Sequence, residues 1–414
     1  MHQYPPSHVG GTELYTQSLS RALVERGHEV SVFCRESAPG VGAQEAIEDG
    51  VRVLRMWVGM LSAGRRFRAT FGDGVVAQRF ERFLETAQPD IVHIQHLMGL
   101  PVDLVACLDE RCIPFVVTLH DYWWVCANAQ LITNYSGALC DGPRAYLNCA
   151  CCALARARQA PDRLPGGGCR LWPLAPALAP LLAWRGHLLR SALRGAQRLI
   201  APSQHVQQWY CSHGLRQVII ERIPHGLDVP PELRGTREVS LPLRFAYVGG
   251  LSWQKGVHVL VDAVAGLNVQ LHIAGDEAFD PPYVATLKAH APENVRFLGR
   301  LGRQQVWELL SQSHALLVPS LWHETFSLIA HEAFAAGVPV IASRVGALAE
   351  AVRDGEDGLL VAPGDAVAWR AALARLVEEP GLLAKLQSSV RPPMGLSEHV
   401  HHVEGVYAAC TAEQ

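Results

Sequence analysis

The chain has 414 residues, of which 49% are hydrophobic and 18% are charged. This composition excludes a largely disordered protein, and the length predicts two to three domains. The formal net charge of −3 excludes a generally basic surface of the kind that binds nucleic acid. Residues 1–11 lack the apolar stretch of a signal peptide, and the apolar run at 171–184 is too short and too rich in proline to span a membrane. We therefore expect a cytoplasmic protein, with peripheral contact to the inner membrane surface as a further expectation.

Short apolar runs rich in β-branched residues recur along the chain, and segments with helical periodicity lie between them. The predicted strands are 28–34, 90–95, 114–119, 198–201, 243–248, 269–274, 295–298, 315–319 and 338–342. Nearly continuous apolar strands are typical of parallel sheets that helices cover on both faces. The alternation of strand and helix predicts an α/β fold, and the number of strands predicts two Rossmann-like domains.

Prolines and a glycine in a polar stretch mark a boundary between the two domains. We predict a first domain at 1–228, a linker at 229–242 and a second domain that begins at 243. Residues from about 126 to 178 are rich in Cys, Pro, Gly and Arg and show no periodicity, which predicts an insertion in the first domain.

The segment 323–342, HETFSLIAHEAFAAGVPVIA, carries the strongest chemical signal. It follows a predicted strand and is expected to form a loop, a helix from about Phe326 and a further strand. The backbone N–H groups at the helix start, a site suited to an anion, belong to Ser327, Leu328 and Ile329. Glu324 and Glu332 could accept hydrogen bonds from sugar and ribose hydroxyls. The segment therefore predicts a sugar-nucleotide site, and the alternative is a polar loop with two solvated glutamates.

Two further motifs suit a phosphate. Gly249 and Gly250 end a predicted strand ahead of Lys255, one of only three lysines in the chain. Glycines let the backbone approach a phosphate, and a lysine supplies a point charge. Gly10 and Gly11 open a predicted helix whose N-terminus could also accept an anion. Taken singly, each motif is equally compatible with an ordinary turn.

His120 and the turn at 224–228 are the last two candidate features of the site. His120 follows a predicted strand, and ligands of open α/β sheets bind at the carboxyl ends of strands. A buried structural histidine and an ordinary Pro-Gly turn are the alternatives.

Together, and in this order, the motifs resemble those of the GT-B glycosyltransferases, and among them the retaining family 4. The resemblance covers nearly the whole chain. It implies two Rossmann-like domains that face a cleft, of which 1–228 binds the acceptor and 243–392 binds the nucleotide sugar. It also implies that 393–414 forms a helix that returns to the first domain.

The resemblance implies a role for each candidate residue. Glu332 would hold the ribose, Glu324 the hydroxyls of the donor sugar, and His120 would lie beside the transferred sugar. The implied catalytic residues are His120, Glu324 and Lys255. The implied donor site comprises Gly10, Gly11, Gly249, Gly250, Lys255, Arg300, Glu324, Phe326, Ser327, Leu328, Ile329 and Glu332.

The implied reaction is retaining transfer of a hexosyl group from a UDP- or GDP-sugar to a glycan, lipid-linked or small-molecule acceptor, as in cell-surface polysaccharide biosynthesis. No Asp-x-Asp motif is positioned for a divalent ion, so no metal or other cofactor is expected to be required for catalysis. The alternatives are a sugar-nucleotide epimerase or hydrolase and a non-catalytic sugar-nucleotide-binding scaffold. The base, the sugar, the acceptor and the oligomeric state stay open.

Four positions depart from the family pattern. Gly250 replaces an arginine that assists Lys255, Ser327 replaces a glycine, and His225 replaces an asparagine. Only residues 1–4 stand where the family has a complete first strand, which indicates a start codon assigned too late or a truncated sequence. Loss of that strand predicts unpaired backbone groups and a gap in the core of the first domain.

Six of the eleven cysteines lie between 126 and 169. Cys126, Cys140, Cys149 and Cys152 include a C-x2-C pair and predict a structural zinc site. The alternatives are an iron–sulfur cluster, with Cys169 as a spare ligand, and a set of free thiols. The neighbouring segment 170–194 mixes arginines with two tryptophans and could lie on a membrane surface. Its prolines favour instead a helix packed on the first domain.

Overall fold

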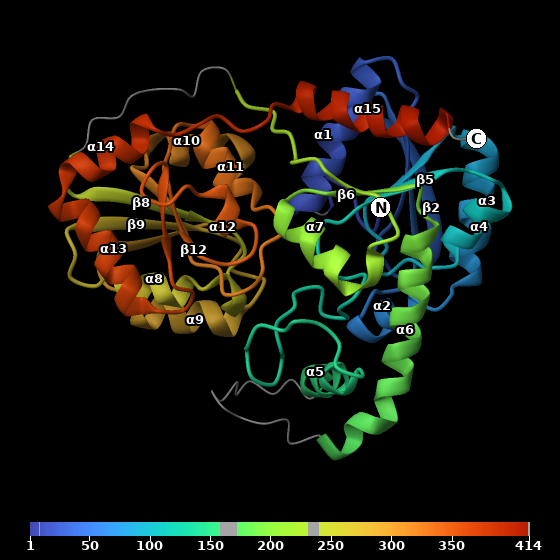
Figure 1. The fold of residues 1–414 in the computed structure, drawn as a ribbon, viewed down its shortest axis with the longest axis horizontal. Helices are drawn as coiled ribbons and strands as arrows, with labels where there is room; N and C mark the ends of the chain where they lie inside the picture. Colours follow the sequence, from blue (N-terminus) through green and yellow to red (C-terminus); the bar gives the residue numbers. More distant parts are fainter. Residues whose placement is uncertain (8, 158–171, 231–239, 413–414) are drawn as a thin grey trace. The chain divides into compact units, whose positions relative to one another are not determined.

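The computed structural model describes residues 1–7, 9–157, 172–230 and 240–412. The chain divides into two compact units (Figure 1). Unit 1 comprises 1–226 and 396–414, and unit 2 comprises 227–395. The division therefore falls two residues before the predicted end of the first domain, and the predicted linker belongs to unit 2, with 231–239 outside the described residues.

A six-stranded sheet forms the centre of unit 2, in the order β10-β9-β8-β11-β12-β13. All of its pairs are parallel. The strands are β8 (Leu243–Val248), β9 (Val269–Ala274), β10 (Val295–Gly299), β11 (Ala315–Val318), β12 (Val340–Ser343) and β13 (Gly358–Val361). The sequence predicts the first five of these strands, so the parallel α/β fold expected for this half of the chain is confirmed, and β13 is an addition.

Helices cover both faces of this sheet because its side chains alternate between two apolar cores. In β8, Phe245 and Tyr247 belong to one core, whereas Ala246 belongs to the other. The first face is covered by α8 (Val257–Ala263), α9 (Pro281–His290), α13 (Ala366–Glu378) and α14 (Pro380–Ser388). The second is covered by α10 (Arg303–Gln312), α11 (Leu328–Ala335) and α12 (Leu348–Ala351). Figure 1 shows α8 and α9 on one side of the sheet and α10 and α11 on the other.

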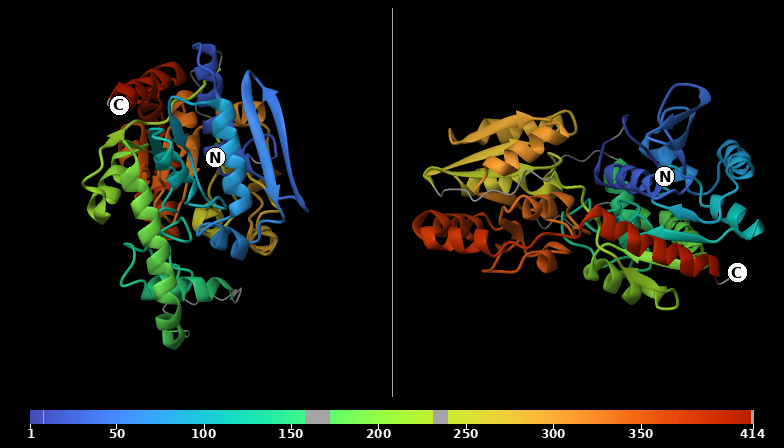
Figure 2. Two further views of the ribbon diagram at one scale, coloured as in Figure 1. Left: turned by 90° about the vertical axis from the view of Figure 1, so that its right-hand side faces the viewer. Right: turned by 90° about the horizontal axis from the view of Figure 1, so that it is seen from above.

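Unit 1 contains two separate sheets in its described residues, with the orders β1-β3-β2 and β4-β5-β6-β7. The strands are β1 (Ser31–Arg35), β2 (Val41–Glu48), β3 (Val51–Val58), β4 (Val92–Ile94), β5 (Phe115–Thr118), β6 (Arg198–Ala201) and β7 (Ile220–Arg222). The sequence predicts neither β2 nor β3, and β2 pairs antiparallel with β3 through the turn at Asp49 and Gly50 (Figure 2). Both turn residues have positive φ, 51° and 79°, as a tight hairpin requires.

Unit 1 contains several α-helices in its described residues. They are α1 (Gly11–Glu25), α2 (Ala63–Ala69), α3 (Gly74–Ala87), α4 (Leu104–Glu110), α5 (Leu147–Ala157), α6 (Ala175–Gly195), α7 (Gln204–Tyr210) and α15 (Leu396–Ala412). The final helix α15 packs on α1, with Val400 and Val403 against Tyr15 and Leu19. The predicted insertion contains α5, which packs on α6, while 158–171 lies outside the described residues. Among the described residues, no helix is long and apolar enough to cross a membrane.

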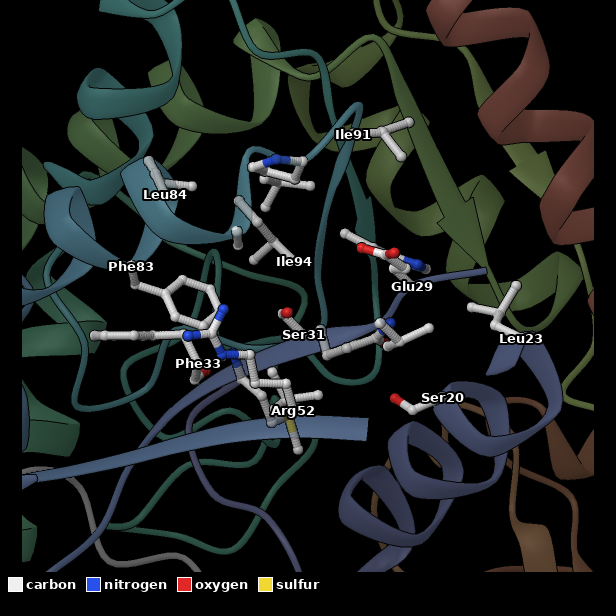
Figure 3. Close-up of a pocket in the computed structure, with 18 of the residues that line it drawn as sticks. Ser20, Leu23, Glu29, Ser31, Phe33, Arg52, Phe83, Leu84, Ile91 and Ile94 are labelled. Atoms are coloured by element: carbon white, nitrogen blue, oxygen red, sulfur yellow. Dashed lines mark hydrogen bonds between the residues drawn. The ribbon is translucent and has the colours of Figure 1, made fainter. Parts of the chain in front are cut away.

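The two sheets of unit 1 end at β1 and β4, and a cavity of about 750 Å³ lies against both strands (Figure 3).

Candidate functional site

The strand order of unit 2 reverses between the neighbouring strands β8 and β11. Two loops leave the carboxyl ends of these strands, 249–256 after β8 and 319–327 after β11. Open α/β sheets bind ligands outside the carboxyl ends of the strands at such a reversal. The fold therefore places the predicted phosphate and sugar motifs at the position where a ligand is expected.

A buried carboxylate joins the two loops. The Oε1 atom of Glu324 accepts hydrogen bonds from Lys255 Nζ at 2.7 Å, Ser320 Oγ at 2.6 Å and Trp322 Nε1 at 3.0 Å. The Lys255 ammonium also lies 5.0 Å from the centre of the Trp322 ring. The Lys255 side chain keeps 29% of its surface exposed. Glu324 therefore orients a lysine that is still open to an anionic ligand.

Two glycines make this arrangement sterically feasible. Gly256 has φ +72°, and a Cβ atom there would lie 2.0 Å from the Pro319 carbonyl oxygen. Gly346 has φ +57°, and its Cβ would lie 2.6 Å from the Glu324 carbonyl oxygen. That same carbonyl accepts a hydrogen bond of 2.8 Å from Ala347 N–H. The supporting role of Gly346 is not evident from the sequence, because a single glycine after a strand is usually an ordinary turn.

The start of α11 is fixed by a backbone turn and a ring stack. Ser327 caps the helix with φ +66° and ψ +78°. The Phe326 ring stacks on the His331 ring at 3.8 Å, and His331 Nδ1–H donates to the Ser327 carbonyl at 3.0 Å. Burial lowers the pKa of His331 to about 4, so the imidazole is neutral at physiological pH. The first N–H groups of α11, including those of Leu328 and Ile329, have no acceptor within the helix and suit a phosphate.

Replacing Ser327 by glycine is expected to stabilise unit 2. A non-glycine residue in the left-handed region costs roughly 1 kcal/mol, and glycine removes that cost. We expect the midpoint of thermal unfolding to rise by about 2–4 °C. Ser311→Gly, inside the helix α10, is the comparison and should lower the midpoint, because glycine disfavours a helix interior. A fall for Ser327→Gly would contradict the strain argument.

Glu332 lies on α11, where it is buried and forms an ion pair with Arg303 of α10. The Arg303 guanidinium also lies 4.8 Å from the centre of the Trp307 ring. Arg303 is absent from the residues predicted from sequence, and its position after the β10 loop gives only a weak signal. Arg300, the cation predicted near the base, is exposed just after β10.

Gly249 and Gly250 lie directly after β8, and they differ in the space around them. The Tyr247 hydroxyl donates to the Gly250 carbonyl at 2.8 Å, and a Cβ on Gly249 would lie 3.0 Å from that hydroxyl. A Cβ on Gly250 would have no described atom within 4 Å. The position at which the family pattern has an arginine therefore has room for a side chain.

The remaining predicted site residues, Gly10, Gly11 and His120, belong to unit 1. Gly10 caps α1, and a Cβ there would lie 2.6 Å from Glu13 Oε2. The buried Glu13 carboxylate pairs with His2 Nε2 at 3.3 Å. A carboxylate therefore already lies at this helix N-terminus, where the sequence predicts room for an anion.

His120 follows β5 in a cluster of aromatic rings. Its Nε2 atom lies 2.7 Å from Gln95 Oε1, and its ring lies 5.0 Å from Tyr15 and 5.1 Å from His225. Burial, reinforced by nearby histidines, lowers the pKa of His120 well below its usual value of 6.5. His120 is therefore a neutral hydrogen-bonding group rather than a cation.

The four cysteines predicted to hold a zinc ion lie on α5 and in the segment before it. Among the described residues, no group of three or more His, Cys, Asp or Glu side chains is arranged to hold a metal ion. The thiols turn toward local acceptors instead: Cys140 Sγ donates to the Gly142 carbonyl at 3.5 Å and Cys149 Sγ to Asn148 Oδ1 at 3.7 Å. Burial, together with the proximity of Cys126 and Cys140, raises the pKa of Cys149 and that of Cys152 to about 12. Cys169 lies outside the described residues.

Solved structures with this architecture are GT-B glycosyltransferases. Sucrose-phosphate synthase from Thermosynechococcus elongatus superposes with a TM-score of 0.71 at 19% identity, over 98% of this chain and 95% of that chain. The Anabaena protein HepE, solved in complex with UDP and glucose, superposes with a TM-score of 0.64 at 18% identity. The superposition covers 98% of this chain and 97% of HepE. The predicted fold class, two Rossmann-like domains of the GT-B type, is confirmed.

Comparisons of the amino-acid sequence also indicate a glycosyltransferase. The model described as Glycosyltransferase Family 4 matches residues 9–229, and the model described as Glycosyl transferases group 1 matches residues 235–391. The chain belongs to glycosyltransferase family 4. It is 27% identical to a glycogen synthase of Mycobacterium tuberculosis, over 94% of this chain and 87% of the relative. It is 26% identical to a D-inositol 3-phosphate glycosyltransferase of Acidothermus cellulolyticus, over 98% of this chain and 87% of that relative.

Proposed function

We propose that the chain transfers a glycosyl group from a nucleoside-diphosphate sugar to an acceptor hydroxyl, with retention of anomeric configuration and without a metal ion. The observation that carries this proposal is the Lys255–Glu324 pair at the strand reversal of unit 2, beside the start of α11. The HepE complexes with UDP and with UDP-glucose, and a starch synthase structure with ADP, support a nucleotide-sugar donor.

The charges of the site fit departure of a diphosphate. Cleavage of the anomeric bond leaves negative charge on the phosphate, and preorganised positive groups stabilise it most effectively. Lys255 and the N–H groups of Leu328 and Ile329 supply such groups, which is the role a divalent ion takes in other transferases. Glu324 would hold Lys255 in position and accept bonds from the donor sugar, and Glu332 would accept bonds from the ribose.

The acceptor hydroxyl would attack from the face that the diphosphate leaves. Its proton would pass to a departing phosphate oxygen, the new bond would form on that same face, and the configuration would be kept. Neutral His120 would act as a hydrogen-bond partner of the transferred sugar. The names of the glycogen synthase and inositol phosphate relatives support a carbohydrate or polyol acceptor.

A nucleotide panel tests the donor site. Because a ligand that binds only the folded state stabilises it by about 2.7 kcal/mol at 100 times its Kd, one of UDP, GDP or ADP should raise the thermal midpoint by roughly 5–10 °C. Glu332→Ala should weaken that nucleotide by roughly 10- to 100-fold, the value of a hydrogen bond to a charged group. Glu308→Ala, an exposed carboxylate on α10, is the matched control and should leave the shift unchanged.

Two results would contradict the proposal. The first is a folded protein whose midpoint none of the three nucleotides changes. The second is release of free sugar at the same rate with and without an acceptor, which would indicate a hydrolase. The anomeric configuration of the product, determined by NMR, tests retention separately.

A further inference from the structure

The first half of α6 presents large apolar side chains to solvent. Leu174, which caps the helix, is 51% exposed, Leu181 is 37% exposed and Trp184 is 52% exposed. Leu181 follows Leu174 by about two helical turns and Trp184 follows three residues later, so the three lie along one side of the helix. Trp172, 55% exposed, extends this side into the 3-10 turn before α6. We call these four residues the α6 apolar face; no charged residue occurs from 172 to 184.

The opposite side of α6 already has the packing that the fold requires. Ala175, Ala179 and Leu182 are buried against α5, and Leu189 and Leu193 are buried in the main core of unit 1. Figures 1 and 2 show the first half of α6 beside α5, extending past the strands of unit 1. The α6 apolar face is therefore additional to the core, and contiguous exposed apolar residues mark a surface that contacts another molecule or a membrane.

The prolines of this segment do not disturb either side of the helix. Pro173, Pro176 and Pro180 are all exposed, and Pro176 stands in the first helical turn, where a missing backbone donor costs little. The buried side is consequently uninterrupted. A helix packed on the first domain and a segment that lies on a membrane surface, the two alternatives predicted for 170–194, are thus compatible with each other.

The helix α2 brings positive charge next to the α6 apolar face. Phe71, which follows α2, stacks on Trp184 with the ring centres 4.8 Å apart. Phe67 of α2 packs against the buried residues that join α5 to α6. The same helix exposes Arg65 and Arg68. Two exposed cations therefore accompany the apolar side chains.

The helices around the α6 apolar face carry no negative charge. α2, α5 and α6 contain seven arginines and no Asp or Glu, whereas the whole chain has a net charge of −3. None of these arginines pairs with a carboxylate of the described residues; Arg156 donates to Asn128 Oδ1 at 2.9 Å and Arg190 to the Tyr146 hydroxyl at 2.6 Å. Burial and the nearby Arg156 lower the pKa of Arg66. The region therefore suits an anionic partner.

A lipid surface that carries negative charge combines both properties. Tryptophan, with an apolar ring and a polar N–H group, favours the boundary between membrane and water. Amphipathic helices bury their apolar side about 5–10 Å into that boundary, and arginines are attracted to anionic headgroups. The helix from Leu174 to Trp184 is about 15 Å long. Its apolar side is thus long enough to enter the boundary while the arginines of α2 stay at the level of the headgroups.

We propose that the α6 apolar face, together with Arg65 and Arg68, forms a docking surface for a membrane that contains anionic lipid. The four apolar side chains enter the interface, and the two arginines contact headgroup phosphates. The inference rests on unit 1 alone and is independent of the proposed catalytic function.

Binding of the full chain to lipid vesicles tests this surface. Vesicles of equimolar phosphatidylcholine and phosphatidylglycerol should sediment with the unmodified chain, and vesicles of phosphatidylcholine alone should bind it roughly tenfold more weakly. Leu174→Ser/Leu181→Ser should weaken binding to the mixed vesicles roughly 10- to 100-fold. Ile47→Ser/Val367→Ser, the matched control, replaces two apolar side chains that are each 79% exposed elsewhere and should bind like the unmodified chain. Equal binding by the two double variants would overturn the proposal, as would an unmodified chain that binds neither kind of vesicle.

A second pair of variants tests the role of charge. Arg65→Gln/Arg68→Gln should weaken binding to the mixed vesicles roughly tenfold at low salt. Arg296→Gln/Arg391→Gln removes two exposed arginines of unit 2 and should change binding by less than about twofold. Equal losses for the two variants would indicate general attraction to the vesicle and overturn the assignment to this surface.

Tryptophan fluorescence shows which surface enters the membrane. Mixed vesicles with brominated acyl chains should quench part of the fluorescence of the unmodified chain. Trp172→Phe/Trp184→Phe keeps the surface apolar and should remove that quenching. Quenching that persists in this variant would mean that another surface enters the membrane and would overturn the proposal. Self-association that Leu174→Ser/Leu181→Ser abolishes, in a chain that binds no vesicle, would overturn it as well and assign the α6 apolar face to a second copy of the chain.

Discussion

Replacing Lys255 by alanine is expected to lower kcat for glycosyl transfer by roughly 10²- to 10³-fold, the usual effect of removing one group that stabilises developing negative charge. The lysine makes the closest cationic contact with Glu324 and remains partly exposed, so it can move its charge to a leaving phosphate. Since this charge matters most as the bond breaks, kcat should fall more than KM rises. Initial rates with a labelled donor sugar, measured with the donor that stabilises the protein, provide the test.

Lys288→Ala is the matched control for this prediction. Lys288 also lies in unit 2 and forms an ion pair of 2.6 Å, with Glu277, but at an exposed site on α9. Its removal should change kcat by less than about twofold, because an exposed ion pair contributes little. A fall in kcat of similar size for both variants would exclude Lys255 as the principal phosphate ligand.

The contact with Glu324 predicts that the two residues do not act independently. Lys255→Ala leaves a buried carboxylate with two neutral donors, and Glu324→Gln leaves the lysine without its anionic partner. Because each change already disrupts the same pair, the double variant should lose much less activity than the product of the single losses.

The sequence predicts the location of this site better than its internal contacts. Strands, helix starts and the order of the motifs follow from local patterns, and the carboxyl ends of β8 and β11 are indeed neighbours. The hydrogen bond between Lys255 and Glu324 joins residues 69 positions apart. Only the order of the strands in the sheet brings such residues together. The contact therefore cannot be predicted from their spacing along the chain.

Residues that support the site are harder still to predict. Gly346 is required because its backbone approaches Glu324, and Arg303 matters because it neutralises Glu332. Neither requirement has a local signature. By contrast, the β2–β3 hairpin has a local signature, the Asp49-Gly50 turn between two eight-residue strands, although the sequence analysis predicts neither strand.

The second large effect expected is a loss of stability in unit 1 below pH 6.5. Three of its histidines are buried and neutral. Burial, with nearby positive groups, lowers the pKa of His93 to about 3; burial lowers that of His399 to about 4; and burial places that of His120 well below 6.5. Their hydrogen bonds fit the neutral form: His399 Nδ1–H donates to the Pro224 carbonyl at 2.8 Å, and Tyr15 donates to His399 Nε2 at 2.9 Å.

The sign of the effect follows from proton binding. In the unfolded chain these histidines take up a proton near pH 6.5, whereas in the folded chain His93 does so only near pH 3 and His399 only near pH 4. Between these values the unfolded state binds more protons, so the free energy of unfolding falls as the pH falls. At pH 5 His93 and His399 each lower it by about 2 kcal/mol, and the two together by up to about 4 kcal/mol, a large part of a typical protein's stability.

His399→Gln tests this account because glutamine can donate and accept hydrogen bonds but does not titrate. Between pH 7.5 and pH 5, the free energy of unfolding measured in urea should fall by about 2 kcal/mol less in this variant than in the unmodified chain. His290→Gln, an exposed histidine at the end of α9, should show the unmodified pH dependence. If His399→Gln retained the full loss at low pH, this imidazole would already be solvated in the folded protein, and the pH dependence would have to come from other groups. If only His399→Gln flattens the curve, the contact of α15 with Pro224 and Tyr15 is the part of unit 1 that acid disrupts.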